Sequence, residues 1–262
     1  MKCEKIIEKL EQLYPLKFAA PWDNPGLQVG DKEQEIHTIY LALDATDEVI
    51  DHAAQEGANL LITHHPMIFS GIKSVTADHF IGRRVIRMIQ KNLCYYAAHT
   101  NYDVAKMADL SASYLELLSY EILSISYCDP QTRQKEGYGR VGNLRREMEL
   151  ERYADMVKSA FFLREVKVFG DPKKKIRRVA ILPGSGKSMI SDAIKAGADV
   201  IITGDIDHHT GIDAVAQGIA VIDAGHYGTE YIFMDQMEQE LKKEFPDLTV
   251  KKEPFQIPFW MV

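Results

Sequence analysis

The chain contains two stretches of matching pattern, and this internal repeat is the feature that most restricts its fold. Residues 179–205 (VAILPGSGKSMISDAIKAGADVIITGD) match residues 41–65 (LALDATDEVIDHAAQEGANLLITHH) in order and character. In both stretches a helical pattern ends at a glycine, and an apolar run then ends in threonine. Downstream, residues 94–103 (CYYAAHTNYD) correspond to residues 220–230 (AVIDAGHYGTE). Several matched features in one order indicate an ancient duplication.

Short apolar runs alternate with helical patterns in each half. In the first half, strands are expected within 36–46, where the strand ends in Asp44, and over 58–66 and 92–103. One helix is expected to start at a cap formed by Thr46 or Asp47 and to run through Gln55, and another is expected over 78–91. Strands alternating with helices at this pitch predict parallel βαβ units. The expected fold is therefore a layered α/β fold in two similar halves.

The two halves are placed at residues 1–128 and 129–262, with a metal site in the cleft between them. The segment CDPQTRQKEGYG (128–139) is polar and contains glycine, which suits a linker. Apolar residues at helical spacing, beginning with Met234 and Met237, predict an amphipathic helix from 230 to about 245. We expect the C-terminal helix and tail to pack back on the first half.

Composition restricts the class of protein and its partners. The 262 residues are 46% hydrophobic, which is enough for a full core, and the net charge is −7. No basic stripe dominates the chain, which argues against a nucleic-acid partner. No apolar run approaches the roughly 20 residues that span a bilayer. Three cysteines without CxxC spacing fit reduced thiols and a cytoplasmic location.

Histidines and carboxylates gather just beyond the expected strand ends. They are His64, His65, His99, Asp103, His226 and Glu230. In open parallel sheets, ligands bind beyond the carboxyl ends of the strands. Imidazole and carboxylate together suit Zn, Fe, Mn or Co. An isolated His-His pair is more often structural, but two His-x-x-x-acid pairs at matched places in a repeat favour a metal site.

The spacing of these residues indicates two ions. His226 and Glu230 are four residues apart, which places them on one helical face. Adjacent residues of an extended chain point to opposite sides, so His64 and His65 suit two ions held roughly 3.5–4 Å apart. Two bridging carboxylates and one further histidine leave open coordination positions. Open positions are typical of catalytic rather than structural metal sites.

Two other motifs each allow a functional and a structural interpretation. PGSGKS (183–188) lacks the first glycine of a P-loop, because Ile181 stands there, so it is either an anion cradle near Ser185 or Ser188 or a tight turn. DIDHH (205–209) resembles the DHH element of a phosphodiesterase family whose remaining acidic motifs are not evident. His208 and His209 remain candidates, with His99, for proton transfer or substrate contact.

Five motifs together resemble the Nif-three-like family, whose members are also called dinuclear metal-centre hexameric proteins or GTP cyclohydrolase 1 type 2 homologues. In order, they are WDNPGLQVG (22–30), LLITHHP (60–66), AAHTNYD (97–103), IITGDIDHH (201–209) and DAGHYGTE (223–230). The chain resembles the short form, without the domain that longer members carry between the halves. The resemblance implies a ring-shaped homohexamer with two metals per subunit. It implies the ligands His64, His65, Asp103, His226 and Glu230, with His99 as a supporting residue or occasional ligand.

These observations lead to one expected function and its alternatives. A metal-dependent hydrolase acting on a nucleotide-like or phosphorylated small molecule is expected first. A metal-binding scaffold or regulator, or a metal chaperone, is the alternative. The apolar tail PFQIPFWMV (254–262) is expected to dock onto its own subunit or across an interface.

Overall fold

The computed structural model describes residues 1–260, which divide into two compact units. The first unit contains Met1–Ala105 and Phe233–Gln256, and the second contains Lys106–Ile232 together with residues 257–260. The boundary expected at residue 128 falls inside the second unit. Met261 and Val262, at the end of the apolar tail, lie outside the described residues. No helix in residues 1–260 is long and apolar enough to cross a membrane.

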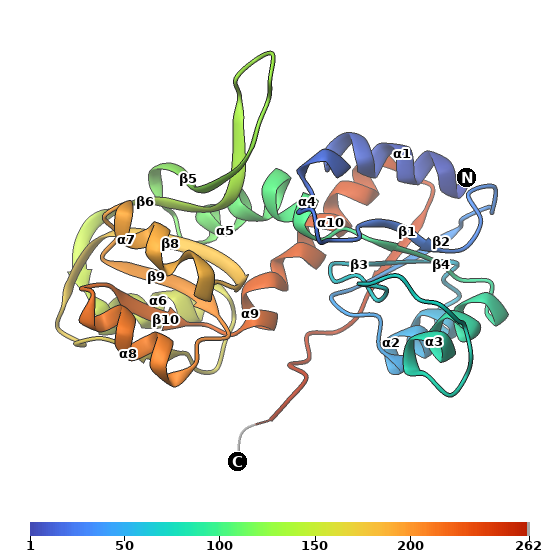
Figure 1. Ribbon diagram of the computed structural model, residues 1–262. Coiled ribbons are helices and arrows are strands. Elements are labelled where there is room, and N and C mark those ends of the chain that lie inside the picture. The colour runs from blue at the N-terminus through green and yellow to red at the C-terminus, as the bar shows by residue number, and fades with distance from the viewer. Residues whose placement is uncertain (261–262) are drawn as a thin grey trace. The chain divides into compact units, whose positions relative to one another are not determined.

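The first unit is a five-stranded sheet with helices on both faces (Figure 1). Its strands are β1 (Gly26–Val29), β2 (Thr38–Ala42), β3 (Leu60–Thr63), β4 (Cys94–Ala97) and β11 (Thr249–Lys252). Its helices are α1 (Cys3–Leu13), η1 (Leu16–Phe18), α2 (Asp47–Gln55), α3 (Phe80–Gln90), α4 (Thr100–Tyr102) and α10 (Ile232–Glu244), and the π-helical turn η2 (Asp103–Met107) leads out of the unit. The strand order is β1-β4-β3-β2-β11, and only β1 is antiparallel to its neighbour.

The central strands of this sheet are buried on both faces. Helices α2 and α3 cover one face, while α1 and α10 lie on the other (Figure 1). All four residues of β3 and of β4 are therefore buried, which explains why residues 60–62 form a continuous apolar run rather than an alternating one. Of the two expected caps of α2, Thr46 is the one observed: its hydroxyl accepts a hydrogen bond from the Val49 amide at 3.2 Å.

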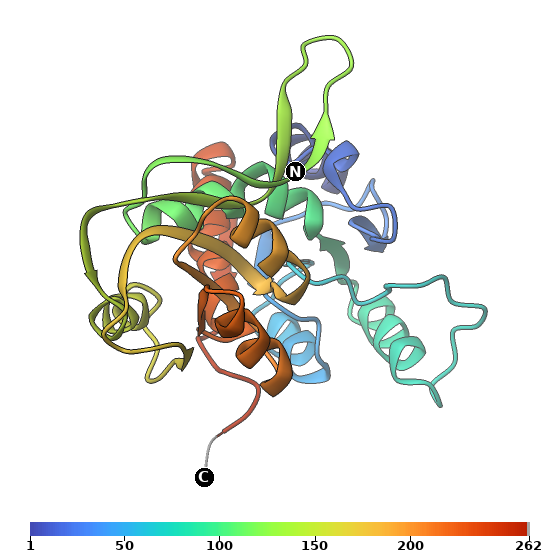
Figure 2. The same ribbon diagram turned by 60° about the vertical axis from the view of Figure 1, so that its left-hand side comes forward.

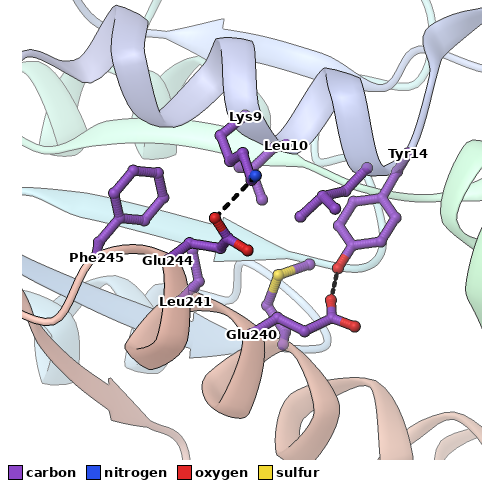
Figure 3. Close-up of a pocket in the computed structure, with 9 residues that line it drawn as sticks. Lys9, Leu10, Tyr14, Glu240, Leu241, Glu244 and Phe245 are labelled. Atoms are coloured by element: carbon purple, nitrogen blue, oxygen red, sulfur yellow. Dashed lines mark hydrogen bonds and ion pairs between the residues drawn. The ribbon is translucent and has the colours of Figure 1, made fainter.

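Helices α1 and α10 pack against each other within the first unit, although they come from opposite ends of the chain. Figure 3 shows the contact: the Lys9 ammonium lies 2.8 Å from the Glu244 carboxylate, and the Tyr14 hydroxyl donates to Glu240. Leu10 and Leu241 are buried between the two helices. The predicted C-terminal helix is thus confirmed, and it belongs to the first unit.

The second unit is built on a six-stranded sheet. Its strands are β5 (Leu118–Cys128), β6 (Lys135–Glu149), β7 (Lys167–Phe169), β8 (Lys175–Ser185), β9 (Val200–Gly204) and β10 (Ala220–Asp223). Its helices are α5 (Ala108–Tyr114), α6 (Leu150–Ala160), η3 (Lys187–Met189), α7 (Ile190–Lys195), α8 (His208–Ala216) and α9 (His226–Glu230). Apolar side chains of α7 and α8 are buried against one face of the sheet (Figure 1).

The sheets of the two units share a topology. Strands β2, β3 and β4 run parallel in the first unit, as β8, β9 and β10 do in the second. In each unit an antiparallel strand that precedes the three in sequence, β1 or β7, pairs with the last of them. The α/β class is therefore confirmed, and the repeated topology fits the predicted duplication.

The segment expected to link two halves is instead the end of a β-hairpin. Strand β5 ends at Cys128 and β6 begins at Lys135, and the hairpin extends beyond its sheet (Figure 2). The Asp129 carboxylate accepts hydrogen bonds from the amides of Gln131 and Thr132, both at 2.9 Å. The linker interpretation is wrong because hairpin turns and linkers share the same polar composition.

Candidate metal centre

Three histidines of the first unit converge beyond neighbouring strand ends. His64 and His65 follow β3, and His99 follows β4, whose Ala97 is in register with Thr63. The ring centroids lie 5.1 Å apart for His64 and His65, 5.3 Å for His64 and His99, and 5.5 Å for His65 and His99. One nitrogen from each ring lies within 4.8 Å of the others. Three imidazoles at this spacing could hold a metal ion.

Each of these rings is oriented by a hydrogen bond from its Nδ1 atom. The acceptors are the Ala98 carbonyl for His64 (2.8 Å), Asp44 Oδ1 for His65 (3.0 Å) and Asp23 Oδ1 for His99 (2.8 Å). Because all three acceptors are oxygens, the hydrogen-bond network assigns the hydrogen to Nδ1 and the lone pair of the neutral ring to Nε2. Metal-ligating histidines are held in this way. The donor set therefore fits a divalent metal.

Asp103 faces His64 rather than His99. Its Oδ1 atom lies 3.3 Å from Nε2 of His64, whose side chain is fully buried. An imidazole lone pair and a carboxylate oxygen repel each other at this distance unless a cation or proton lies between them. Among residues 1–260, no ion pair joins His99 to Asp103, although the sequence suggested that these two residues form a pair.

Asp23 is a buried carboxylate that supports His99. Its side chain is inaccessible to solvent, and its Oδ2 atom accepts hydrogen bonds from both the amide and the hydroxyl of Thr100. Burial alone would raise the pKa of Asp23, but hydrogen bonds from His99 and Thr100 outweigh it and lower the pKa to about 2. The PWDNPGLQVG loop thus places a carboxylate that is ionised at neutral pH beside His99.

The second unit presents a histidine and a glutamate one helical turn apart. His226 begins α9, and its Nε2 atom lies 3.1 Å from Oε2 of Glu230, as the spacing of four predicts. His226 Nδ1 lies 2.7 Å from Asp205 Oδ2. Burial lowers the pKa of His226, but the carboxylates of Glu230 and Asp205 outweigh it and raise the pKa to about 9. Two carboxylates against one imidazole leave a net negative charge, which favours a cation.

The PGSGKS segment encloses the Glu230 carboxylate rather than a free anion. Gly184 has φ +72°, and a Cβ atom at this position would lie 2.2 Å from Glu230 Oε1. The Gly184 amide donates to the Thr229 hydroxyl at 3.0 Å, and Lys187 pairs with Asp207. The structure therefore favours the tight-turn interpretation over the anion cradle.

His208 and His209 lie apart from these ligand clusters. Both are exposed in the first turn of α8, which Asp207 caps by accepting from the Thr210 amide at 2.9 Å. Their rings contact each other with centroids 5.2 Å apart. In the described part of the chain, neither contributes to a group of three potential metal ligands. Of the three proton-transfer candidates, only His99 lies beside a predicted ligand.

Comparison with known proteins identifies the family. A family model described as Duf34/NIF3 (NGG1p interacting factor 3) matches residues 1–258. The chain belongs to the Duf34/NIF3 family. A Clostridium acetobutylicum protein named GTP cyclohydrolase 1 type 2 homolog is 36% identical over 242 residues, covering 92% of this chain and 90% of that protein.

Solved structures of the Duf34/NIF3 family share this fold. A Bacillus cereus protein related to NIF3 has a TM-score of 0.90 and 25% identity, and the match covers 100% of this chain and 99% of that chain. Staphylococcus aureus protein SA1388 also has a TM-score of 0.90, with 29% identity and the same coverage. The predicted resemblance is thus confirmed.

Three carboxylates and one glycine of this Duf34/NIF3 protein were missed as supporting residues. Asp23, Asp44 and Asp205 orient histidines, and Gly184 makes room for a carboxylate. The sequence contained a signal for two of these residues. Asp44 ends the first strand pattern, and Asp205 occupies the position in the second repeat that His65 occupies in the first. Asp23 had only its place in a dense Gly, Pro and Asn loop.

Proposed function

We propose that this Duf34/NIF3 protein binds two divalent metal ions and is a metal-dependent hydrolase. The proposed ligands are His64, His65 and Asp103 of the first unit, and His226 and Glu230 of the second. The observation that carries the proposal is the common orientation of the histidines, because Nδ1 of each is bonded to an oxygen and Nε2 remains as the ligand atom. Zn, Fe, Mn and Co all suit this donor set.

The chain's own residues would orient the ligands and move a proton. Asp44 and Asp205 fix the rings of His65 and His226. His99, held by ionised Asp23, presents its Nε2 atom beside His64 and His65 and could transfer a proton. A divalent ion held there would act as a Lewis acid, which lowers the pKa of a bound water molecule and polarises a substrate oxygen. For His208 and His209, the proposed role is contact with the substrate.

A nucleotide-like or phosphorylated small molecule is the proposed substrate. Support comes from the relatives named GTP cyclohydrolase 1 type 2 homolog. A homohexameric assembly and a cytoplasmic location belong to the same proposal, the latter supported by three free cysteines.

The test is turnover by metal-loaded protein. Protein loaded separately with Zn, Mn and Fe is assayed against a panel of phosphoesters and nucleotides, beside His65→Ala and the exposed control His37→Ala. We expect hydrolysis of at least one compound by wild type and His37→Ala, and its loss in His65→Ala. Turnover of no compound, or equal turnover in His65→Ala, would contradict the hydrolase proposal.

The alternative is a metal-binding scaffold or metal chaperone. A chaperone needs exchangeable metal, which a chelator would remove rapidly at neutral pH. Retention of metal together with absence of turnover would instead favour the scaffold.

A further inference from the structure

Two large aromatic side chains are exposed beside the histidine cluster of the first unit. Trp22 is 60% exposed and Phe69 is 47% exposed. Their rings are stacked, with centroids 5.6 Å apart and an angle of 17° between the planes. His99 contacts both rings edge-on, with centroid distances of 6.1 Å to Trp22 and 5.9 Å to Phe69. An exposed apolar patch beside potential ligand atoms is typical of a binding surface.

Hydrogen bonds hold the two loops that carry these rings. Asp23, the residue after Trp22, is fixed by His99 and Thr100. Asn24 Nδ2 donates to the Ile68 carbonyl at 2.6 Å, and the Ile68 amide donates to Gln28 Oε1 at 2.8 Å. Hydrogen bonds thus hold the residues next to Trp22 and Phe69 in place. A preorganised aromatic surface loses less entropy on binding a ligand than a mobile one does.

A cavity adjoins Phe69 on the same loop. It has a volume of about 530 Å³ and is lined by residues 67–74 and 79–81. Its size suits a small-molecule ligand. Phe69, Ile72 and Phe80 give apolar walls, and Lys73 contributes an ammonium group. In residues 1–260 Lys73 forms no ion pair with a carboxylate, so its charge is available to an anionic group of a ligand.

We propose that Trp22 and Phe69 form a subsite that binds the planar aromatic ring of an anionic small molecule. This inference rests on the proposed hydrolase function, because it names the class of ligand used by that site. The exposed rings offer faces on which a planar ligand ring can stack, and the ammonium group of Lys73 favours an anionic ligand. His99 then lies next to the bound ring, so the ring positions the rest of the ligand at the histidine cluster.

The experiment uses Trp22 as its own reporter. The chain has two tryptophans, so Trp260→Phe leaves Trp22 alone. The Trp260→Phe protein is loaded with metal and titrated with guanosine 5′-monophosphate. A separate titration uses ribose 5-phosphate, which has the phosphate but no aromatic ring. We expect saturable quenching of Trp22 fluorescence by the nucleotide and none by the sugar phosphate.

Further substitutions in the Trp260→Phe protein test whether the nucleotide binds at the subsite. Phe69→Leu is expected to raise the dissociation constant of the nucleotide roughly tenfold or more, as loss of a stacking partner does. Phe162→Leu removes an 81% exposed phenylalanine of the second unit and is expected to leave the constant unchanged. Trp22→Leu, measured by calorimetry, is expected to weaken binding in the same direction as Phe69→Leu.

Two results would overturn the subsite. One is the absence of saturable quenching by the nucleotide, and the other is an unchanged dissociation constant in Phe69→Leu. This experiment measures binding and not turnover, so the subsite proposal and the hydrolase proposal can fail independently of each other. Protein that binds the nucleotide in this way without hydrolysing anything contradicts only the proposed function.

Discussion

Each candidate metal-binding histidine depends on an acceptor that lies elsewhere in the sequence. Asp44 is 21 residues from His65, Asp205 is 21 residues from His226, and Asp23 is 76 residues from His99. A neutral imidazole presents a defined lone pair only when its other nitrogen is bonded. The candidate ligands were proposed from residue type and strand position. Their acceptors were not, because the contacts depend on the tertiary fold.

Removing one acceptor tests this dependence. Asp44→Ala is expected to weaken metal binding roughly 10- to 100-fold, because the ring of His65 loses its orientation and basicity. Chelator competition measures the affinity. The exposed Asp213→Ala serves as the control and is expected to bind metal like wild type. Equal affinity in Asp44→Ala and wild type would show that Asp44 does not support the site.

Gly184 allows a second test at the residue scale. Gly184→Ala combines a left-handed backbone with a Cβ atom that would collide with Glu230. Gly197→Ala has nearly the same φ, +70°, but an open space around its Cβ, so it isolates backbone strain. Both are expected to lose about 1–2 kcal/mol of unfolding free energy from strain. Only Gly184→Ala is expected to lose further stability and metal affinity, measured by urea unfolding and elemental analysis.

At the scale of elements, the packing of α1 on α10 makes stability depend on pH. Burial, and then the nearby charge of Glu244, raise the pKa of Glu240 from 4.5 to about 7. A raised pKa means that the folded state binds the proton more tightly than the unfolded state does. The stabilising contribution is complete below pH 4.5 and is lost as pH rises through about 7.

Glu240→Gln is therefore expected to increase the free energy of unfolding at pH 8 by roughly 1 kcal/mol, a value reduced for solvent screening. It is also expected to flatten the pH dependence between 4.5 and 8. Glu238→Gln on the same helix is the control: burial raises the pKa of Glu238, but Lys242 and Lys252 outweigh it and lower the pKa, so no gain is expected. Equal pH profiles for wild type and Glu240→Gln would contradict this account.

The elements most readily predicted were those with strong local patterns. Helices α2, α3 and α10 and strands β2 and β3 appear within a few residues of their expected positions. Strand β4 also appears, but it ends at Ala97, and the last part of the strand expected over 92–103 instead forms α4 and the start of η2. The long hairpin of β5 and β6 was missed. Its tip has the composition of a linker, and the pairing that defines it is visible only in the folded sheet.

At the scale of the whole molecule, the described part of the apolar tail, residues 254–260, carries exposed aromatic side chains. Phe259 is 62% exposed and Trp260 is 80% exposed. Exposed aromatics are enriched where protein surfaces meet, so we predict that the tail docks on a second copy of the chain. Deleting residues 255–262 is expected to lower the sedimentation coefficient and the melting temperature. Unchanged values for both would refute this role.

The repeated topology was predictable because duplication leaves matched patterns along the chain. The division into units was less predictable, because α10 and β11 belong to the first unit although they lie near the C-terminal end of the sequence. Parallel pairing of β11 with β2 joins residues more than 200 positions apart, and no local pattern indicates it.

The central claim is a pair of metal ions held by residues of both sequence halves. The most direct measurement is elemental analysis of the natively purified protein beside His65→Ala, Glu230→Ala and the control His37→Ala. We predict about two equivalents per chain in wild type and His37→Ala, and clear loss in both ligand variants. Wild-type stoichiometry in either ligand variant, or no metal in wild type, would contradict the claim.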